Sequence, residues 1–184
     1  MQRISILLFL LVFSFAGAVQ AQAPAPKPDP ELRKLSVQLG HWTYEGKYKP
    51  GPLVGPGGNF TGDFTGQMIL GGFFFQGRWT EKGPTGEERG LEIDGYDSVN
   101  RDFASNWYMS DGSRFSGVLT FAGNTYTYVG KLIAAEKEYQ FKVTYVLAPD
   151  LTTATEKGEI STDGKTWTLF GEEKWTKAQP AAKN

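Results

Sequence analysis

Residues 41–48 read HWTYEGKY, and their alternation is the clearest indication of the fold. Trp42, Tyr44, Gly46 and Tyr48 occupy alternate positions, and the residues between them are polar or charged. A period of two places the three aromatic rings on one face of an extended strand and the polar side chains on the other. This pattern is typical of an antiparallel strand with one face against a core and the other in water.

The same alternation recurs along most of the chain. It is clearest in residues 138–147, EYQFKVTYVL, where aromatic and aliphatic residues alternate with polar ones. Turn signals such as Asp111-Gly112 and Asp163-Gly164 separate runs of roughly 8–14 residues, which indicates a meander of about ten antiparallel strands. The less regular runs are NFTGDFTGQM (59–68), FFFQGRW (73–79), DFASNWYM (102–109), SRFSGVLTF (113–121) and KTWTLFGEEKW (165–175).

A meander with one apolar face must hide that face, either by closing on itself or by folding into two packed sheets. Glycines inside the runs favour strong bending, so we expect a closed all-β, up-and-down barrel, with a two-sheet sandwich as the alternative. Charges at Glu45, Lys47, Asp63 and Lys142 fall on the other face of the strands. Because such charges are costly against lipid, we expect a soluble barrel.

A short helix precedes the first strand. Asp29 is suited to cap its start, Pro30 to its first position, and Gly40 to a left-handed conformation at its end. A helix of about three turns carries one apolar stripe, which needs a partner. We therefore expect it to lie across one end of the barrel through Leu32, Leu35 and Leu39.

The N-terminus has the pattern of an export signal. Arg3 precedes an apolar run of about 15 residues that ends in small residues, and the run is short for a membrane span. We expect cleavage after Ala21 and a periplasmic or secreted protein with no membrane span once processed. The alternatives are cleavage after Ala23 and an uncleaved anchor. The resulting organisation is a signal peptide (1–21), a proline-rich linker (22–30), the lipocalin-like barrel domain (31–177) and a polar tail (178–184).

Composition excludes several kinds of chemistry. The chain has 184 residues, no cysteine and one histidine, so it has no disulfide, thiolate nucleophile, cysteine metal site or multi-histidine cluster. Nineteen basic residues balance 20 acidic ones, which disfavours binding of nucleic acid through bulk charge. We therefore expect no metal, no cofactor and no nucleic-acid partner, and nothing in the composition sets the oligomeric state.

A series of short motifs resembles a known family. Gly40-His41-Trp42, a Gly-x-Trp just after a short helix, is similar to the N-terminal signature of lipocalins and other calycin barrels. The longer series resembles a family of exported bacterial proteins known only as a domain of unknown function, over about residues 31–177. Its motifs are LxxLxxxLGxW (32–42), GPLVGPGG (51–58), ILGGFF (69–74), Gly95-Tyr96-Asp97 and Asn106-Trp107.

The resemblance implies a lipocalin-like barrel and no known activity. In calycin barrels a basic residue on the last strand packs over the Gly-x-Trp tryptophan, and Lys174 or Lys177 is the candidate here. A related group of haem-binding barrels uses a histidine on a late strand as its iron ligand. No histidine follows Phe141, which argues against haem.

The aromatic face predicts a pocket for one small hydrophobic ligand, because barrels of this size lie between those whose interior is filled by side chains and those that can hold a ligand. The alternative is that these rings only pack on one another, which would give a filled barrel that acts as a protein-interaction module. In a lipocalin-like barrel the loop 49–58 would be a lid with Leu53 and Val54 at its tip, and the alternative is a disordered connector. The candidate ligand-binding residues are Trp42, Tyr44, Phe64, Phe75, Trp79, Trp107, Phe141, Tyr145 and Trp167.

A third hypothesis is an enzyme, an isomerase or hydrolase that uses a buried carboxylate and a tyrosine. No nucleophile–base pair supports it, so we assign no catalytic residue and favour a non-enzymatic role. His41 has the opposite parity to Trp42 and is expected to point outward. We interpret the remaining acidic and apolar residues as outer-face groups: Glu87, Glu88, Glu92 and Asp94, and Phe74, Tyr108, Val118, Val146 and Phe170.

Overall fold

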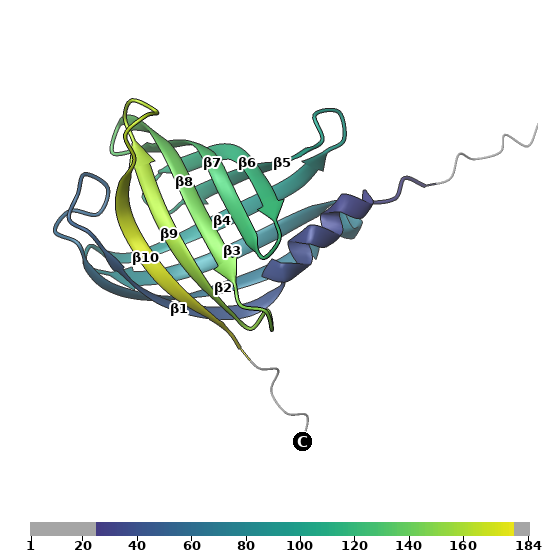
Figure 1. Cartoon of the computed structure of the whole chain (residues 1–184), viewed down its shortest axis with the longest axis horizontal. Helices are drawn as coiled ribbons and strands as arrows, with labels where there is room; N and C mark the ends of the chain where they lie inside the picture. Colours follow the sequence, from purple (N-terminus) through teal and green to yellow (C-terminus); the bar gives the residue numbers. More distant parts are fainter. Residues whose placement is uncertain (1–24, 179–184) are drawn as a thin grey trace, which may run out of the picture.

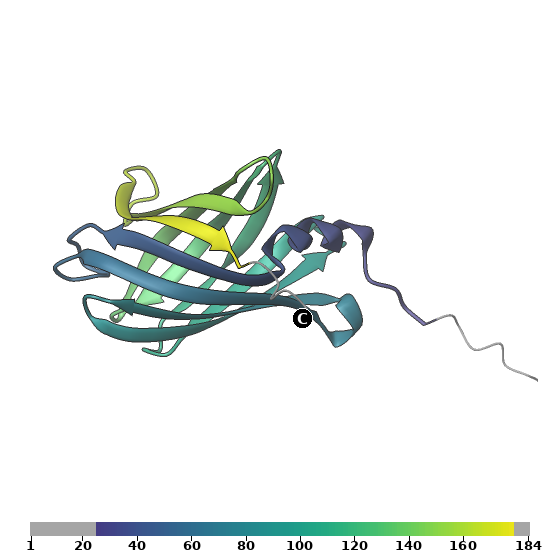
Figure 2. The ribbon, with the colours of Figure 1, turned by 90° about the horizontal axis from the view of Figure 1, so that it is seen from below.

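The protein is a closed barrel of ten antiparallel strands, seen in a computed structural model that describes residues 25–178. Strand order follows the chain, and β1 also pairs with β10, so the sheet has no free edge (Figures 1 and 2). The closed all-β barrel is confirmed. Its strands are β1 Gly40–Tyr48, β2 Gly58–Ile69, β3 Phe74–Gly83, β4 Gly86–Asp97, β5 Asp102–Met109, β6 Arg114–Ala122, β7 Thr125–Ala134, β8 Lys137–Leu147, β9 Thr153–Ser161 and β10 Thr168–Lys177.

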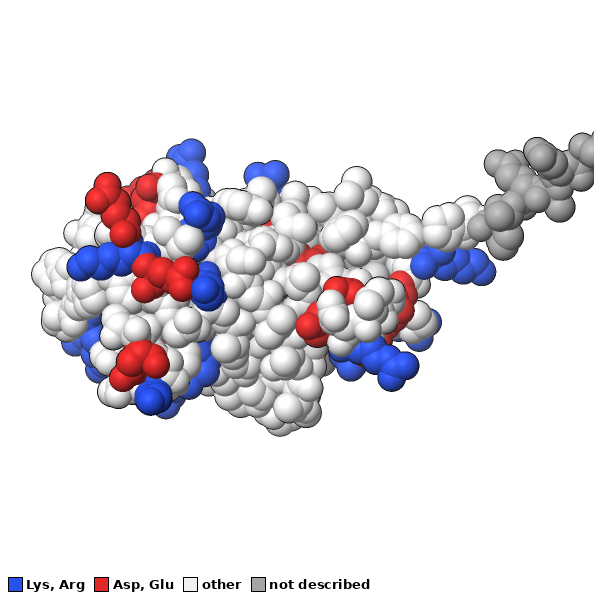
Figure 3. All heavy atoms as spheres, turned by 90° about the horizontal axis from the view of Figure 1, so that it is seen from above, with Lys and Arg blue, Asp and Glu red and all other residues white. Residues whose placement is uncertain are grey.

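Some of the expected organisation lies outside the described residues. The signal peptide (1–21) and almost all of the polar tail (178–184) are not described, so the cleavage site stays a prediction. No helix among residues 25–178 has the length and apolar character needed to cross a membrane. On the face shown in Figure 3, acidic and basic side chains are interspersed at the loop end and again near the helix.

The N-terminal helix is tighter than expected. It is a 3-10 helix, η1 (Pro30–Gln38), capped by Asp29, whose carboxylate accepts from the Glu31 N–H at 2.9 Å. Three residues per turn put Gln38 on the buried face with Leu32 and Leu35, and Leu39, at the end of the helix, packs partly buried against the core. The helix lies at one end of the barrel, and the β1–β2 loop lies at the other (Figures 1 and 2). A second, three-residue helix, η2 (Leu70–Gly72), joins β2 to β3.

The strand register puts aromatic rings inside. In the pairing of β1 with β2, Trp42 is opposite Phe64, and both side chains are buried. Lys177 Nζ lies 5.1 Å from the centroid of the Trp42 ring, so the basic residue implied by the calycin resemblance is Lys177. His41 is exposed on the outer face, as its parity predicts.

Strand β10 differs from its predicted parity. Its pairing with β9 shifts between Leu169 and Gly171, so one extra residue enters the strand there. Phe170, expected outside, turns toward the barrel interior. Trp167 precedes the strand and lies under Lys142 Nζ at 4.6 Å from its ring centroid. The assignment of Trp167 to the ligand pocket was therefore wrong, because the irregularity breaks the alternation that links it to Trp175.

Glycines make room for the large inward rings. Gly90 on β4 pairs with Trp79 on β3, and a Cβ atom at position 90 would overlap the indole ring. Gly62 stands in the same relation to Tyr44. Both glycines have an ordinary extended backbone. Glycine is therefore required at these positions for space and not for a left-handed conformation.

Gly90→Ala is expected to destabilise the barrel by about 1–3 kcal/mol, because the indole ring has to move out of a packed position. Urea unfolding of the purified protein measures this change. In a Trp79→Leu background the same glycine substitution should cost much less, since the overlapping ring is gone. Equal costs in the two backgrounds would contradict the close packing of Trp79 on Gly90.

Candidate functional site

The interior contains a cavity of about 190 Å³ toward the end opposite η1. Its wall is formed by residues from nine of the ten strands, all but β6, and by Leu53 and Val54 of the β1–β2 loop. Asp111 and Ser113, from the β5–β6 connection, belong to the same wall, and Asp111 is exposed. The cavity is therefore reached from the loop end of the barrel.

Six of the nine predicted ligand-binding residues line this cavity: Tyr44, Phe64, Trp79, Trp107, Phe141 and Tyr145. Trp42 lines a smaller cavity beneath η1, and Phe75 is fully buried in the core and lines neither cavity. Trp167 lies outside the barrel. The structure thus brings most of the predicted aromatic group around one space, and the ligand-binding role of these residues stays a prediction.

Three acidic residues of β4 point the opposite way from our expectation, whereas Glu87 is exposed on the outer side as expected. Glu92 is 4% exposed and Asp94 is fully buried, while Leu91 and Ile93 lie on the outer side. The interpretation of Glu92 and Asp94 as a solvated outer face was wrong, and Glu88 also faces the cavity. The register of β4 with β3 explains the inward orientation, because Asp94 pairs with the inward Phe75 and Glu88 pairs with Glu81.

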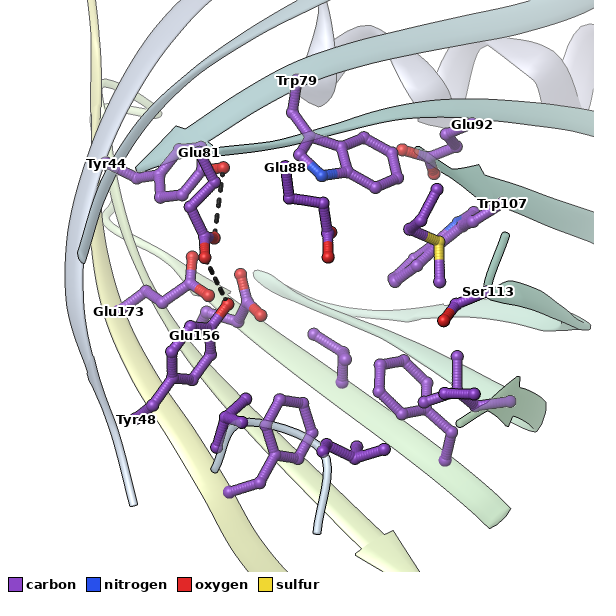
Figure 4. Close-up of a pocket in the computed structure, with 18 of the residues that line it drawn as sticks. Tyr44, Tyr48, Trp79, Glu81, Glu88, Glu92, Trp107, Ser113, Glu156 and Glu173 are labelled. Carbon is purple, nitrogen blue, oxygen red and sulfur yellow. Dashed lines mark hydrogen bonds between the residues drawn. The ribbon is translucent and has the colours of Figure 1, made fainter. Parts of the chain in front are cut away.

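Five glutamates line the cavity, on β3, β4, β9 and β10. Figure 4 shows those on β3, β9 and β10 converging on one side, with the two of β4 beside Trp79 and Trp107. None was among the predicted site residues, although Glu81 shares the parity of Trp79 and Glu173 that of Trp175. The five are Glu81, Glu88, Glu92, Glu156 and Glu173.

Glu81 is held by two tyrosine hydroxyls. Tyr48 donates to its Oε1 at 2.7 Å, and Tyr44 approaches its Oε2 at 3.5 Å (Figure 4). Burial raises the pKa of Glu81 to about 7, and the hydrogen bond from Tyr48 opposes that shift. The Glu81 carboxyl therefore changes charge near neutral pH.

Glu156 and Glu173 meet at a single donor. Trp175 Nε1 lies 3.0 Å from an oxygen of each, so one N–H serves two carboxyl groups. Burial raises the pKa of Glu156 to about 7, and burial together with the charge of Glu156 raises that of Glu173 well above its ordinary range. Two carboxylates this close in a poorly hydrated site do not both ionise without a cation beside them.

A third acidic group lies deeper, toward η1. The Tyr128 hydroxyl lies 2.6 Å from Glu92 Oε1 and 3.5 Å from Asp94 Oδ2. Burial and the neighbouring Asp94 raise the pKa of Glu92 well above its ordinary range, and burial raises that of Asp94 to about 6. The pair holds at least one proton at neutral pH.

No lysine, arginine or histidine from the described part of the chain lines the cavity. Within residues 25–178, no group of three or more acidic or histidine side chains is arranged so that it could hold a metal ion. The cavity thus combines aromatic walls with carboxyl groups that lack a basic partner. Such a lining suits a molecule with an apolar body and either a positive charge or hydrogen-bond donors.

Comparison with known proteins identifies a family and a similar fold and assigns no activity. The model of a family described as a protein of unknown function, DUF1579, matches residues 27–177. The crystal structure of Rv2717c from M. tuberculosis is similar with a TM-score of 0.58 and 14% sequence identity, covering 83% of this chain and 100% of that chain. No curated protein matches.

A de novo designed fluorescence-activating β-barrel gives a TM-score of 0.41 with 11% identity, covering 78% of this chain and 95% of that chain. At these identities the likeness to Rv2717c extends to the barrel fold alone. The family match confirms the resemblance drawn from the motifs at 32–42 and beyond: the family is one of unknown function.

The raised pKa values predict an unusual pH dependence of stability. Glu81, Glu156 and Asp94 hold protons in the folded state that the unfolded chain releases, so the unfolding free energy falls as pH rises. We expect a loss of at least about 2 kcal/mol between about pH 5 and about pH 8, measured by urea unfolding. Glu156→Gln should flatten the slope.

The matched control is Glu159→Gln on the same strand. Glu159 pairs with Lys142 on the outer side, so its loss should leave the slope unchanged. An unfolding free energy that rises over this pH range would contradict the burial of protonated carboxyls.

Proposed function

We propose that this chain, which belongs to the DUF1579 family of proteins of unknown function, is a binding protein that holds one small molecule inside its barrel. The observation that carries the proposal is the cavity, with aromatic rings on its wall and five glutamates that have no basic partner among its lining residues. A lining that only filled the barrel would leave no such space. The cavity thus argues against the filled-barrel interaction module.

The aromatic wall favours a ligand with a compact apolar body. A cavity of about 150 Å³ is known to accept a benzene-sized molecule, so the volume of about 190 Å³ here suits one or two fused rings. Trp79 and Trp107 meet edge to face at 6.1 Å, and Phe141 packs against Trp107 at 5.7 Å. These rings form a preformed surface on which a flat apolar group is buried.

The carboxyl groups favour a basic group on the same ligand. Glu81, Glu156 and Glu173 lie on one side of the cavity (Figure 4), where a positive charge would relieve their mutual repulsion. Tyr44 stacks on Trp175 at 4.3 Å beside them, which adds aromatic faces that attract a cation. The expected ligand is a small aromatic or aliphatic amine, bound with release of protons from the carboxyl groups.

The β1–β2 loop is proposed to control access. Leu53 and Val54 at its tip line the cavity, and a bridge between Gly51 and Gly55 closes the loop on itself. An apolar tip over the cavity mouth shields the bound molecule from water and slows its release. This is the lid that the sequence predicts.

Carboxylate-dependent catalysis is a second candidate, and one observation favours it. Tyr128 and Glu92 form a short hydrogen bond beside Asp94, and Glu92 lines the cavity. A protonated carboxyl and a tyrosine together polarise a carbonyl group in some isomerases. Deuterium incorporation next to the carbonyl of small ketones, lost in Glu92→Gln, would support this activity.

Export is also a proposal. Residues 1–21 support it through their charge and apolar pattern, and they lie outside the described residues. The intact mass of the protein from its native host tests it. A mature chain that begins at Gln22 is expected, and a chain that retains residues 1–21 would contradict it.

Three matched probes test the binding proposal: naphthylmethylamine, naphthalenemethanol and naphthoic acid, titrated by calorimetry. The amine should bind at least about tenfold more tightly than the alcohol, and the acid most weakly, because only the amine neutralises the carboxyl cluster. Affinity for the amine should rise as pH increases through about 7, since Glu81 and Glu156 then ionise.

Adjacent glutamates on β10 provide the control. Glu173→Gln should weaken amine binding about tenfold and leave alcohol binding unchanged. Glu172→Gln should change neither, because Glu172 is exposed on the outer face near Lys157. Equal binding of amine and alcohol would contradict the proposed basic group of the ligand and leave the binding function in place. Failure of all three probes to bind would contradict the binding function itself.

Replacement of Leu53 and Val54 by serine should speed ligand release by roughly tenfold with a small effect on the association rate, because the lid acts after the ligand has entered. Stopped-flow fluorescence of the bound naphthyl probe measures both rates. An unchanged release rate would exclude the lid role.

A further inference from the structure

A second, water-sized cavity lies at the other end of the barrel, beneath η1. Its volume is about 20 Å³, and Gln38 of the helix and Trp42 of β1 form part of its wall. Phe64, Glu92, Tyr145 and Trp175 line both cavities, so these side chains separate the two spaces. Glu92 therefore faces the main cavity and the small one.

Two buried N–H donors at this small cavity have no acceptor. Gln38 Nε2 and Trp42 Nε1 are both without a hydrogen-bond partner within the described chain, and their residues are 5% and 3% exposed. Unpaired buried donors are rare in folded proteins because they lose their bonds to water without replacement. The lining contains acceptors that a single small molecule would connect to them: Glu92, Tyr126 and Tyr145.

We propose that the small cavity is a binding site for one internal water, held by Gln38, Trp42 and Glu92, and that Gln38 thereby positions the carboxyl group of Glu92. A volume of about 20 Å³ accepts one water and excludes any organic ligand. The water accepts from Gln38 Nε2 and Trp42 Nε1 and donates to Glu92.

The water completes a closed ring of hydrogen bonds. The Tyr128 hydroxyl lies 2.9 Å from Gln38 Oε1 and 2.6 Å from Glu92 Oε1. A hydroxyl has one proton, so when Tyr128 donates it to Gln38, the short bond to Glu92 requires the carboxyl to donate. Each group then has a partner: Glu92 donates to Tyr128, Tyr128 to Gln38, Gln38 to the water, and the water back to Glu92.

Burial and the neighbouring Asp94 raise the pKa of Glu92 and keep it protonated on the wall of the main cavity, and the ring directs its proton toward Tyr128. The titratable groups that face it are Asp94 on its own strand, Tyr126 and Tyr128 on β7, and Tyr145 on β8, and no basic side chain of the described chain is among them. Gln38 is thus a positioning residue, and η1 connects to the ligand cavity through hydrogen bonds as well as through Leu32 and Leu35. This inference is independent of which molecule the main cavity takes.

The first test is a high-resolution crystal structure of the full chain. It should show one solvent peak within hydrogen-bond distance of both Gln38 Nε2 and Trp42 Nε1. In Trp42→Phe, which keeps an aromatic ring and removes the N–H, the water should become less ordered. A cavity without a solvent peak in the wild-type protein, or a direct bond between Gln38 and Trp42, would overturn the water site.

The second test reads the positioning role by infrared spectroscopy at neutral pH. The carbonyl absorption of the protonated buried carboxyls should lose one component in Glu92→Gln, and that component should be shifted in Gln38→Met, which keeps the side-chain length and removes the amide. Leu32→Ala, which loosens the helix and keeps the amide, should leave the component in place. An unshifted component in Gln38→Met would overturn the role of Gln38.

Discussion

The pairing of β1 with β10 closes the sheet, and this closure determines which side chains share the interior. Once the barrel is closed, every residue of inward parity faces the other strands, whether it is aromatic or acidic. The inward positions that line the cavity contain aromatic rings and five glutamates, with no basic side chain among them. The cavity, the raised pKa values of its glutamates and the short bonds to tyrosine all follow from this enclosure.

Much of the fold is predictable from local pattern. The alternation in 41–48 and 138–147 identifies the strands, and the turn signals divide them correctly into ten, because a half-buried strand must alternate. Gly40 and Trp42 point to the short helix and to the lysine over the ring, and Lys177 occupies that position. These features depend on neighbours in sequence or on a known motif.

The features that sequence analysis missed depend on pairing across strands. Hydrophobicity suggests that Leu91 and Ile93 are inside, yet the register with β3 places them outside and turns Glu92 and Asp94 inward. The irregularity in β10 reverses the parity of Phe170 relative to Trp167, and alternation alone does not reveal it. Gln38 is buried because the helix has three residues per turn, which the leucine spacing does not specify. A prediction that extended parity from Trp79 to Glu81 would have found part of the acidic lining.

Native mass spectrometry of the protein purified gently from its own host tests whether the barrel holds a small molecule with a basic group. We expect an added mass that is lost on denaturation and belongs to a compact amine. A mass that matches the bare chain under both conditions would contradict it, as would a bound molecule that carries a negative charge.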